Sequence, residues 1–89
     1  MGENSLEILF VDDESGLLDQ ARIFLEKEDM IFNVDTAISP EKALDMLDKK
    51  DYDVIVSDYQ MPKIDGLEFL RILREERNRD IPFIMFTGK

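Results

Sequence analysis

The sequence predicts an α/β domain with a mostly parallel sheet, because short apolar runs alternate with amphipathic stretches along the chain. Apolar runs occupy residues 6–11, 53–57 and 82–87, and a more polar run occupies residues 31–36. The stretches between them carry apolar residues at helical spacing. Such alternation of strands and helices favours parallel pairing with right-handed crossovers. The length of 89 residues allows one domain at most.

The first predicted strand, residues 6–11, is followed by a predicted helix over residues 15–28. Ser15 is a residue type that caps the start of a helix. Apolar residues then fall on one face of this helix, namely Leu17, Ala21, Phe24 and Leu25. The spacing therefore indicates an amphipathic helix.

Residues 31–36 form the second predicted strand, and their pattern favours a position at the edge of the sheet. Apolar and polar residues alternate in this run. Phe32 and Val34 are expected on one side of the strand, and Asn33 and Asp35 on the other.

The second predicted helix begins after Ser39, which can cap it. Pro40 takes the first helical position, where the missing N–H of proline does no harm. Lys49 and Lys50 lie near the negative end of the helix dipole. The expected buried face consists of Ala43, Leu44 and Leu47.

The third strand is predicted at residues 53–57 and the fourth at residues 82–87. A loop over residues 59–66, with Pro62 and Gly66, follows the third strand. The third helix is marked by Leu67, Leu70 and Leu73 and ends near Arg77. The fourth strand is apolar throughout its centre, and an apolar edge strand is a template for pairing with another chain. We expect either that the domain is truncated here or that a partner covers this edge.

Acidic residues stand where two of the apolar runs stop. Asp12 and Asp13 follow the first run, and Asp58 follows the third. Ligands of open α/β sheets bind at the carboxyl ends of strands. If these two strands are neighbours, the carboxylates converge, and at about 5 Å each pair repels by roughly 3 kcal/mol at an effective dielectric of about 20. A hard divalent cation is the simplest way to hold them together, although the pattern alone equally allows a structural role beside a helix start.

Composition excludes several function classes. The formal charge is −10, from 11 basic and 21 acidic residues, which argues against nucleic-acid binding by this chain. No apolar run is long enough to cross a bilayer, and the first residues lack the pattern of a signal peptide. Cysteine is absent, so disulfides and thiolate metal sites are excluded. These features fit the reducing cytoplasm.

Three motifs carry a resemblance to a known family. They are FVDDE at residues 10–14, SDYQMPKIDG at residues 57–66 and FTG at residues 86–88. Together they resemble the receiver domain of two-component response regulators, over residues 6–89. The resemblance implies a flavodoxin-like, doubly wound parallel sheet with strand order 2-1-3-4. It also implies that residues 1–89 form one receiver domain, incomplete at the C-terminus.

The resemblance implies roles for five residues. Asp58 would accept a phosphoryl group from a phosphohistidine of a sensor histidine kinase or a phosphotransfer protein. Asp12, Asp13 and Asp58 would hold Mg²⁺ together with the backbone carbonyl of Gln60. Thr87 would hydrogen-bond the phosphoryl group and act as a switch. The chain would thus be an acceptor that is not an enzyme in the usual sense.

The sequence also departs from the family pattern. The fifth strand and the last two helices are missing, and with them the lysine that pairs with the phosphoryl group in the family. We hypothesise that the bared sheet makes the chain stable only as an oligomer, with a homo-oligomer formed through the edge of the fourth strand.

Two other function classes compete with this interpretation. A phosphatase of the haloacid dehalogenase type also joins acids to Mg²⁺, but it requires Asp-x-Asp after the first strand, which the Asp12-Asp13-Glu14 run does not provide. A non-phosphorylated interaction or dimerisation module is the other alternative, and the missing segment favours it.

Overall fold

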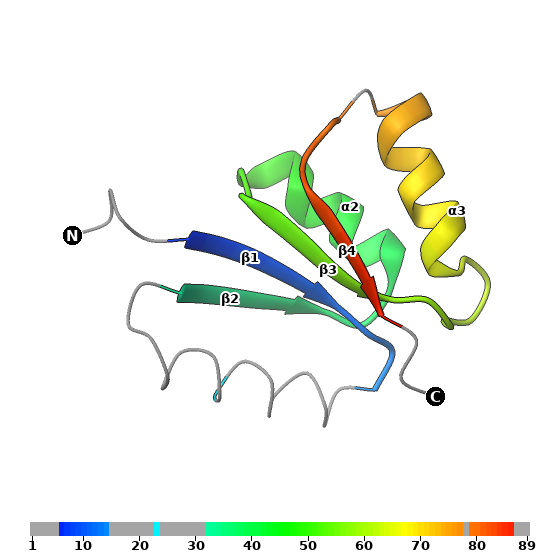
Figure 1. The fold of residues 1–89 in the computed structure, drawn as a ribbon, viewed down its shortest axis with the longest axis horizontal. Helices are drawn as coiled ribbons and strands as arrows, with labels where there is room; N and C mark the ends of the chain where they lie inside the picture. The colour runs from blue at the N-terminus through cyan, green and yellow to red at the C-terminus, as the bar shows by residue number, and fades with distance from the viewer. Residues whose placement is uncertain (1–5, 15–22, 24–31, 78, 87–89) are drawn as a thin grey trace.

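The computed structural model describes residues 6–14, 23, 32–77 and 79–86. Within these residues the strands are β1 (Leu6–Val11), β2 (Phe32–Ala37), β3 (Val54–Asp58) and β4 (Phe83–Phe86). The helices are α2 (Pro40–Lys49) and α3 (Gly66–Arg71), and a π-helical turn, Ile72–Glu76, continues α3. Figure 1 shows this arrangement.

The four strands form one parallel sheet in the order β2-β1-β3-β4, which confirms the predicted order. In its register Val11 lies opposite Ala37 on one side and Ser57 on the other. The arrowheads of the strands therefore end at the same edge of the sheet (Figure 1). The sequence-based bounds of β1 were correct, those of β2 and β3 are shifted by one residue at each end, and β4 begins one residue later than predicted.

The hydrophobic core lies between one face of the sheet and the two helices. Because side chains alternate along a strand, every second residue of each strand faces these helices. Full burial of each large aliphatic side chain stabilises the fold by about 1.5–3 kcal/mol. The core residues are Leu9, Val11, Ala37, Ala43, Leu47, Tyr52, Ile55, Phe69 and Leu73.

Helix α2 begins as the sequence predicted. The Ser39 hydroxyl accepts a hydrogen bond from the Lys42 backbone N–H at 3.2 Å, and Pro40 is the first helical residue. Ala43 and Leu47 are buried, whereas Leu44 is only partly buried against the core. The helix therefore meets the sheet through a narrower stripe than expected.

Helix α3 begins one residue earlier than predicted, and the leucines that mark it in the sequence differ in their burial. Asp65 caps the helix, and its carboxylate accepts a hydrogen bond from the Glu68 backbone N–H at 2.9 Å. The loop before the helix therefore ends at Asp65, one residue earlier than predicted. Leu73 is fully buried, whereas Leu67 is 57% exposed. Phe69 and Leu73, one turn apart, are fully buried and anchor this helix to the sheet.

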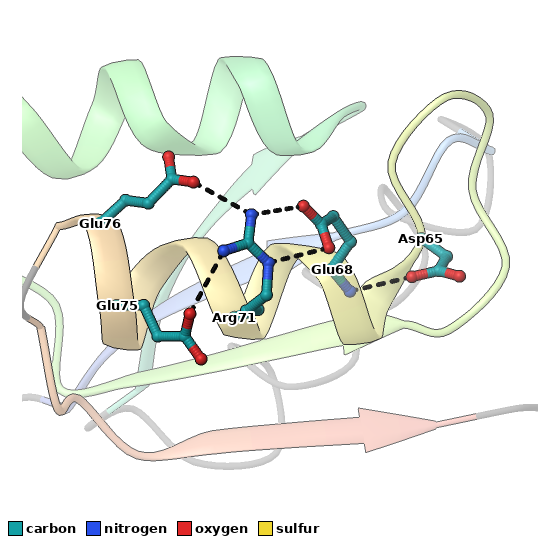
Figure 2. A network of polar contacts seen from close by, with 5 residues as sticks. All are labelled: Asp65, Glu68, Arg71, Glu75 and Glu76. Atoms are coloured by element: carbon teal, nitrogen blue, oxygen red, sulfur yellow. Dashed lines mark hydrogen bonds and ion pairs between the residues drawn. The ribbon is translucent and has the colours of Figure 1, made fainter.

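The exposed side of α3 carries an ion-pair network that we call the Arg71 cluster, formed by Arg71 with Glu68, Glu75 and Glu76. The guanidinium lies 2.6 Å, 3.3 Å and 3.0 Å from these three carboxylates in turn. Figure 2 shows the three glutamates around the guanidinium. The π-helical geometry, in which the Arg77 N–H donates to the Ile72 carbonyl at 2.9 Å, brings Glu76 onto this side.

Some predictions fall outside the described residues. The expected helix over residues 15–28 and the end of the fourth strand at Thr87 are among them. In the part of the chain that is described, no helix has the length and apolar character needed to cross a membrane.

Candidate functional site

The sheet brings the three predicted aspartates together at its carboxyl edge. We call Asp12, Asp13 and Asp58 the acid cluster, and oxygen atoms of their carboxylates all lie within 4.8 Å of one another. They meet because β1 and β3 are neighbours in register and each run of apolar residues stops at the same level. Asp12 is 1% exposed and Asp58 is fully buried, whereas Asp13 is exposed.

Backbone hydrogen bonds fix two of these aspartates. The Asp12 N–H donates to the Ala37 carbonyl at 3.1 Å, which extends the pairing of β1 with β2 by one step. The Asp12 carboxylate accepts the Glu14 N–H at 3.1 Å, and that of Asp58 accepts the Gln60 N–H at 3.3 Å. Each carboxylate is thus oriented by the turn that follows its own strand.

The backbone around Asp58 is held by Ser57 and Gly66, two residues to which the sequence analysis gave no role. The buried Ser57 hydroxyl donates to the Asp58 carbonyl at 3.0 Å. A Cβ at Gly66 would lie 2.6 Å from that same carbonyl oxygen, which is too close for any other residue without movement. The sequence predicts Gly66 only as a loop residue, and no pattern in it indicates this contact.

The loop between Asp58 and α3 is closed and strained. The Gly66 N–H donates to the Tyr59 carbonyl at 2.7 Å, and the Tyr59 N–H donates to the Phe86 carbonyl of β4 at 2.8 Å. Within the loop Lys63 has a φ of 70°, and the Ile64 N–H donates to the Pro62 carbonyl at 2.7 Å, which forms a γ-turn. A non-glycine residue in this region costs about 1–3 kcal/mol.

The donor set of the acid cluster fits a hard cation. Mg²⁺ prefers carboxylate and carbonyl oxygens in near-octahedral geometry and keeps several waters. Three carboxylates within 4.8 Å, one of them exposed, provide oxygens together with an open side for water. The Gln60 backbone lies against the Asp58 carboxylate through its N–H, while the metal-binding role of its carbonyl stays a prediction.

A second group of polar residues lies away from the acid cluster, on the side of the sheet where β1 begins. Contacts within this group raise the pKa values of two of its members. We call it the Lys50 cluster: Lys50 with Glu7, Asp35 and Tyr52. The Lys50 ammonium lies 3.0 Å from Glu7 and from Asp35, and its hydrogen bonds to Asp35 and then Glu7 hold its pKa well above the usual range. Burial, followed by a 2.6 Å hydrogen bond to Asp35, raises the pKa of Tyr52 to about 12.

Solved structures with this fold include several receiver proteins. The chemotaxis protein CheY4 of Vibrio cholerae matches with a TM-score of 0.84 and 29% identity, over 96% of this chain and 70% of that one. The response regulator TrrA of Thermotoga maritima, solved in complex with Mg²⁺–BeF, matches with a TM-score of 0.81 and 32% identity, over 94% of this chain and 70% of that one. The fold is therefore flavodoxin-like, as predicted.

Curated proteins give the same result. The response regulator Rre1 of Synechocystis is 35% identical over 85 residues, which are 94% of this chain and 36% of Rre1. The chain thus spans about a third of the length of such relatives. A family model described as the response regulator receiver domain matches residues 8–89. The chain therefore belongs to the receiver-domain family of response regulators.

Proposed function

We propose that this chain accepts a phosphoryl group on Asp58 from a phosphohistidine of a sensor histidine kinase or a phosphotransfer protein, in the cytoplasm. The observation that carries the proposal is the acid cluster, in which a buried aspartate at the end of β3 meets two aspartates at the end of β1. The likeness to receiver proteins, one of them solved with Mg²⁺–BeF, supports it.

The proposed step is a phosphoryl transfer between two protein side chains. A carboxylate oxygen of Asp58 attacks phosphorus and forms a P–O bond. The P–N bond to the donor histidine breaks, and its electron pair returns to the imidazole, which takes up a proton. The product is an acyl phosphate, and a carboxylate is a known acceptor in such chemistry.

In this proposal Asp12, Asp13 and Asp58, with the Gln60 carbonyl, hold Mg²⁺, which supplies charge neutralisation for the transferring phosphoryl group. Asp12 is kept in place by the hydrogen bond from the Glu14 N–H. Asp13, the exposed member, faces the side from which a donor can approach. Thr87 is proposed to hydrogen-bond the phosphoryl group, although it lies outside the described residues.

Asp58 is buried, which keeps water away from the carboxylate during the proposed phosphoryl transfer. Its backbone is immobilised by the Ser57 hydroxyl and by the close approach of Gly66. A carboxylate held in this way needs little reorganisation to reach phosphorus, which lowers the entropic part of the barrier.

The test is the intact mass after incubation with Mg²⁺ and acetyl phosphate. We expect the wild type to gain one phosphoryl group and Asp58→Asn to gain none. The matched control is Asp45→Asn, because Asp45 is an exposed aspartate on α2, outside the acid cluster, and its loss should leave the gain intact. If Asp58→Asn is modified like the wild type, the proposed acceptor is wrong.

A second candidate function is assembly with another copy of the chain through β4. This strand is at the edge of the described sheet, and Ile84 is 56% exposed within a wholly apolar strand. Analytical ultracentrifugation across a hundredfold range of concentration tests it. A mass that stays at one chain throughout would exclude this assembly, and Ile84→Lys should abolish it if it exists.

A further inference from the structure

A hollow of about 370 Å³ lies directly beside the acid cluster, between the turn after β2 and the loop after β3. Asp13 of the acid cluster forms part of its wall, so the hollow and the candidate site are continuous. Its lining includes Asp13, Ile38, Pro40, Glu41, Met61 and Lys63.

The sheet explains why the hollow opens here. The Asp12 N–H bonds to the Ala37 carbonyl, so Ile38 leaves the end of β2 at the level of the acids that follow β1. Met61 lies three residues after Asp58 and reaches the hollow from the other side. The two apolar side chains therefore line the hollow together with Asp13 of the acid cluster.

The hollow has an apolar floor and an exposed apolar rim. Pro40 is buried, and Met61 is partly buried against the core. Ile38, by contrast, is 53% exposed although it is a large aliphatic side chain. An apolar side chain from a partner would cover Ile38 and fill the space above Pro40, with a gain in buried apolar area.

The charges around the hollow define the partner further. Asp13 and Glu41 are acidic and exposed, and carboxylate oxygens of Asp13 and the other two members of the acid cluster lie within 4.8 Å of one another. Lys63, which the γ-turn places at the rim, is the basic residue among the lining positions. With a chain charge of −10, the surroundings attract a basic surface.

We propose that this hollow is the docking point for an apolar side chain of the phosphodonor protein, flanked by lysine or arginine residues that face Glu41. The inference rests on the proposed function, because the continuity with Asp13 places the occupant next to the transferring group. A small phosphodonor has no side chain to put there, so the hollow affects transfer from a protein and not from acetyl phosphate.

The experiment compares two donors on the same variants. The protein donor is the autophosphorylated sensor kinase that phosphorylates the wild-type chain fastest among a panel of purified kinases, and the small donor is acetyl phosphate. We expect Ile38→Asp to lower kcat/KM with the kinase about tenfold, as loss of one buried anchor does. The rate with acetyl phosphate should stay within about twofold of wild type.

Two further variants make the test specific. Leu67→Asp is the matched control, since Leu67 is 57% exposed and lies on α3 outside the hollow, and it should leave both donors unaffected. Glu41→Lys tests the charge of the partner, and we expect it to lower the kinase rate about threefold and to leave acetyl phosphate unaffected.

The outcomes separate this inference from the proposed function. An unchanged kinase rate in Ile38→Asp overturns the docking inference, and so does an equal loss with both donors. A wild type that accepts from acetyl phosphate and from no kinase of the panel also overturns it, while the acceptor site stands. A wild type that accepts from neither donor overturns the proposed function itself.

Discussion

Two groups of three carboxylates in this chain are arranged in opposite ways. In the Arg71 cluster three well-exposed glutamates surround a guanidinium at 2.6 to 3.3 Å (Figure 2). In the acid cluster three aspartates face one another within 4.8 Å, and two of them are removed from solvent. The Arg71 cluster includes an arginine that pairs with its three carboxylates. The acid cluster places three negatively charged side chains together at the ends of two strands.

The comparison shows what holds each group together. The Arg71 cluster is held by attraction between its members, which lie within five residues of Arg71 on one helix and the turn that continues it. The acid cluster is held against repulsion by the pairing of β1 with β3 and by the backbone bonds at their ends. Its geometry is therefore imposed by the core rather than by attraction between its members.

The largest effect is expected when one charge is removed from the acid cluster. Asp12→Asn keeps the oxygen that accepts the Glu14 N–H but removes a carboxylate from the cluster. Without Mg²⁺, we expect the free energy of unfolding to rise by about 1–3 kcal/mol, because repulsion is relieved. The stabilisation by Mg²⁺ that we expect of the wild type should disappear. Urea unfolding with Mg²⁺ and with a chelator measures both.

The matched control for that variant is Glu75→Gln, which removes one carboxylate from the Arg71 cluster instead. It should change neither the unfolding free energy without Mg²⁺ nor the response to the ion by a measurable amount. If Asp12→Asn lowers the stability in the chelator, repulsion does not dominate the acid cluster and the comparison fails.

An effect of similar size and opposite sign is expected from the glycine that supports the acid cluster. In Gly66→Ala the new Cβ would lie 2.6 Å from the Asp58 carbonyl, so the backbone must move. Such overpacking costs typically about 1–3 kcal/mol, read from the urea midpoint. The acetyl phosphate rate should fall as well, because the acceptor shifts. Leu67→Ala, at the next, exposed position, should change neither quantity.

The Lys50 cluster allows a test by pH. Its lysine ammonium pairs with Glu7 and Asp35, and the Tyr52 hydroxyl donates to Asp35. The pKa of Tyr52 is raised from 10.0 to about 12 by burial and by Asp35. The folded state therefore holds this proton more tightly, so its contribution to stability is fully present below pH 10 and is lost as the pH rises toward 12.

We expect the unfolding free energy of the wild type to fall between pH 10 and pH 12, and that of Tyr52→Phe to fall less over the same range. Lys50, whose pKa is also raised, accounts for part of the remaining fall. Tyr52→Phe should also lose about 1 kcal/mol at neutral pH with its hydrogen bond. In Tyr59→Phe, Tyr52 is the remaining tyrosine, and an ultraviolet titration then reads its pKa directly; a midpoint near 10.0 would contradict the assigned contact.

The smallest effect is expected at Arg71 itself. Its hydrogen bond to Glu68 lowers the pKa of that carboxyl, and Arg71→Gln should return the pKa to its ordinary range in an NMR titration. Because the folded pKa is depressed, the contribution is present above the unfolded pKa and is lost as the pH falls through the folded one. The urea midpoint at neutral pH should hardly move, since all partners are exposed. A large loss would mean that the cluster supports α3.

The strands and the acid cluster were predictable because their signals are local and strong. The apolar runs end at Asp12 and Asp58, and this one pattern gives both the strands and their carboxyl edge. The face of α3 was less accessible to prediction. Leu67 and Phe69 are both apolar, and only the position of the capping Asp65 against the sheet decides which of them is buried.

The role of Ser57 and Gly66 was also beyond the sequence. Both act on the backbone carbonyl of Asp58. The close approach of Gly66 in α3 to Asp58 in β3 depends on the path of the strained loop between them. That loop contains the γ-turn at Lys63, which no sequence pattern predicts. The hollow beside Ile38 depends on the same path.

The central position of β1 has a consequence for the synthesis of this chain. This strand is synthesised before both of its partners, β2 and β3. Until they emerge, the apolar strand has both backbone edges open to wrong pairing. Parallel pairing across such separations also makes folding slow relative to helical domains of this size. We expect the nascent chain to be most prone to aggregation until residue 58 has left the ribosome, which pulse-labelling of ribosome-bound intermediates would reveal.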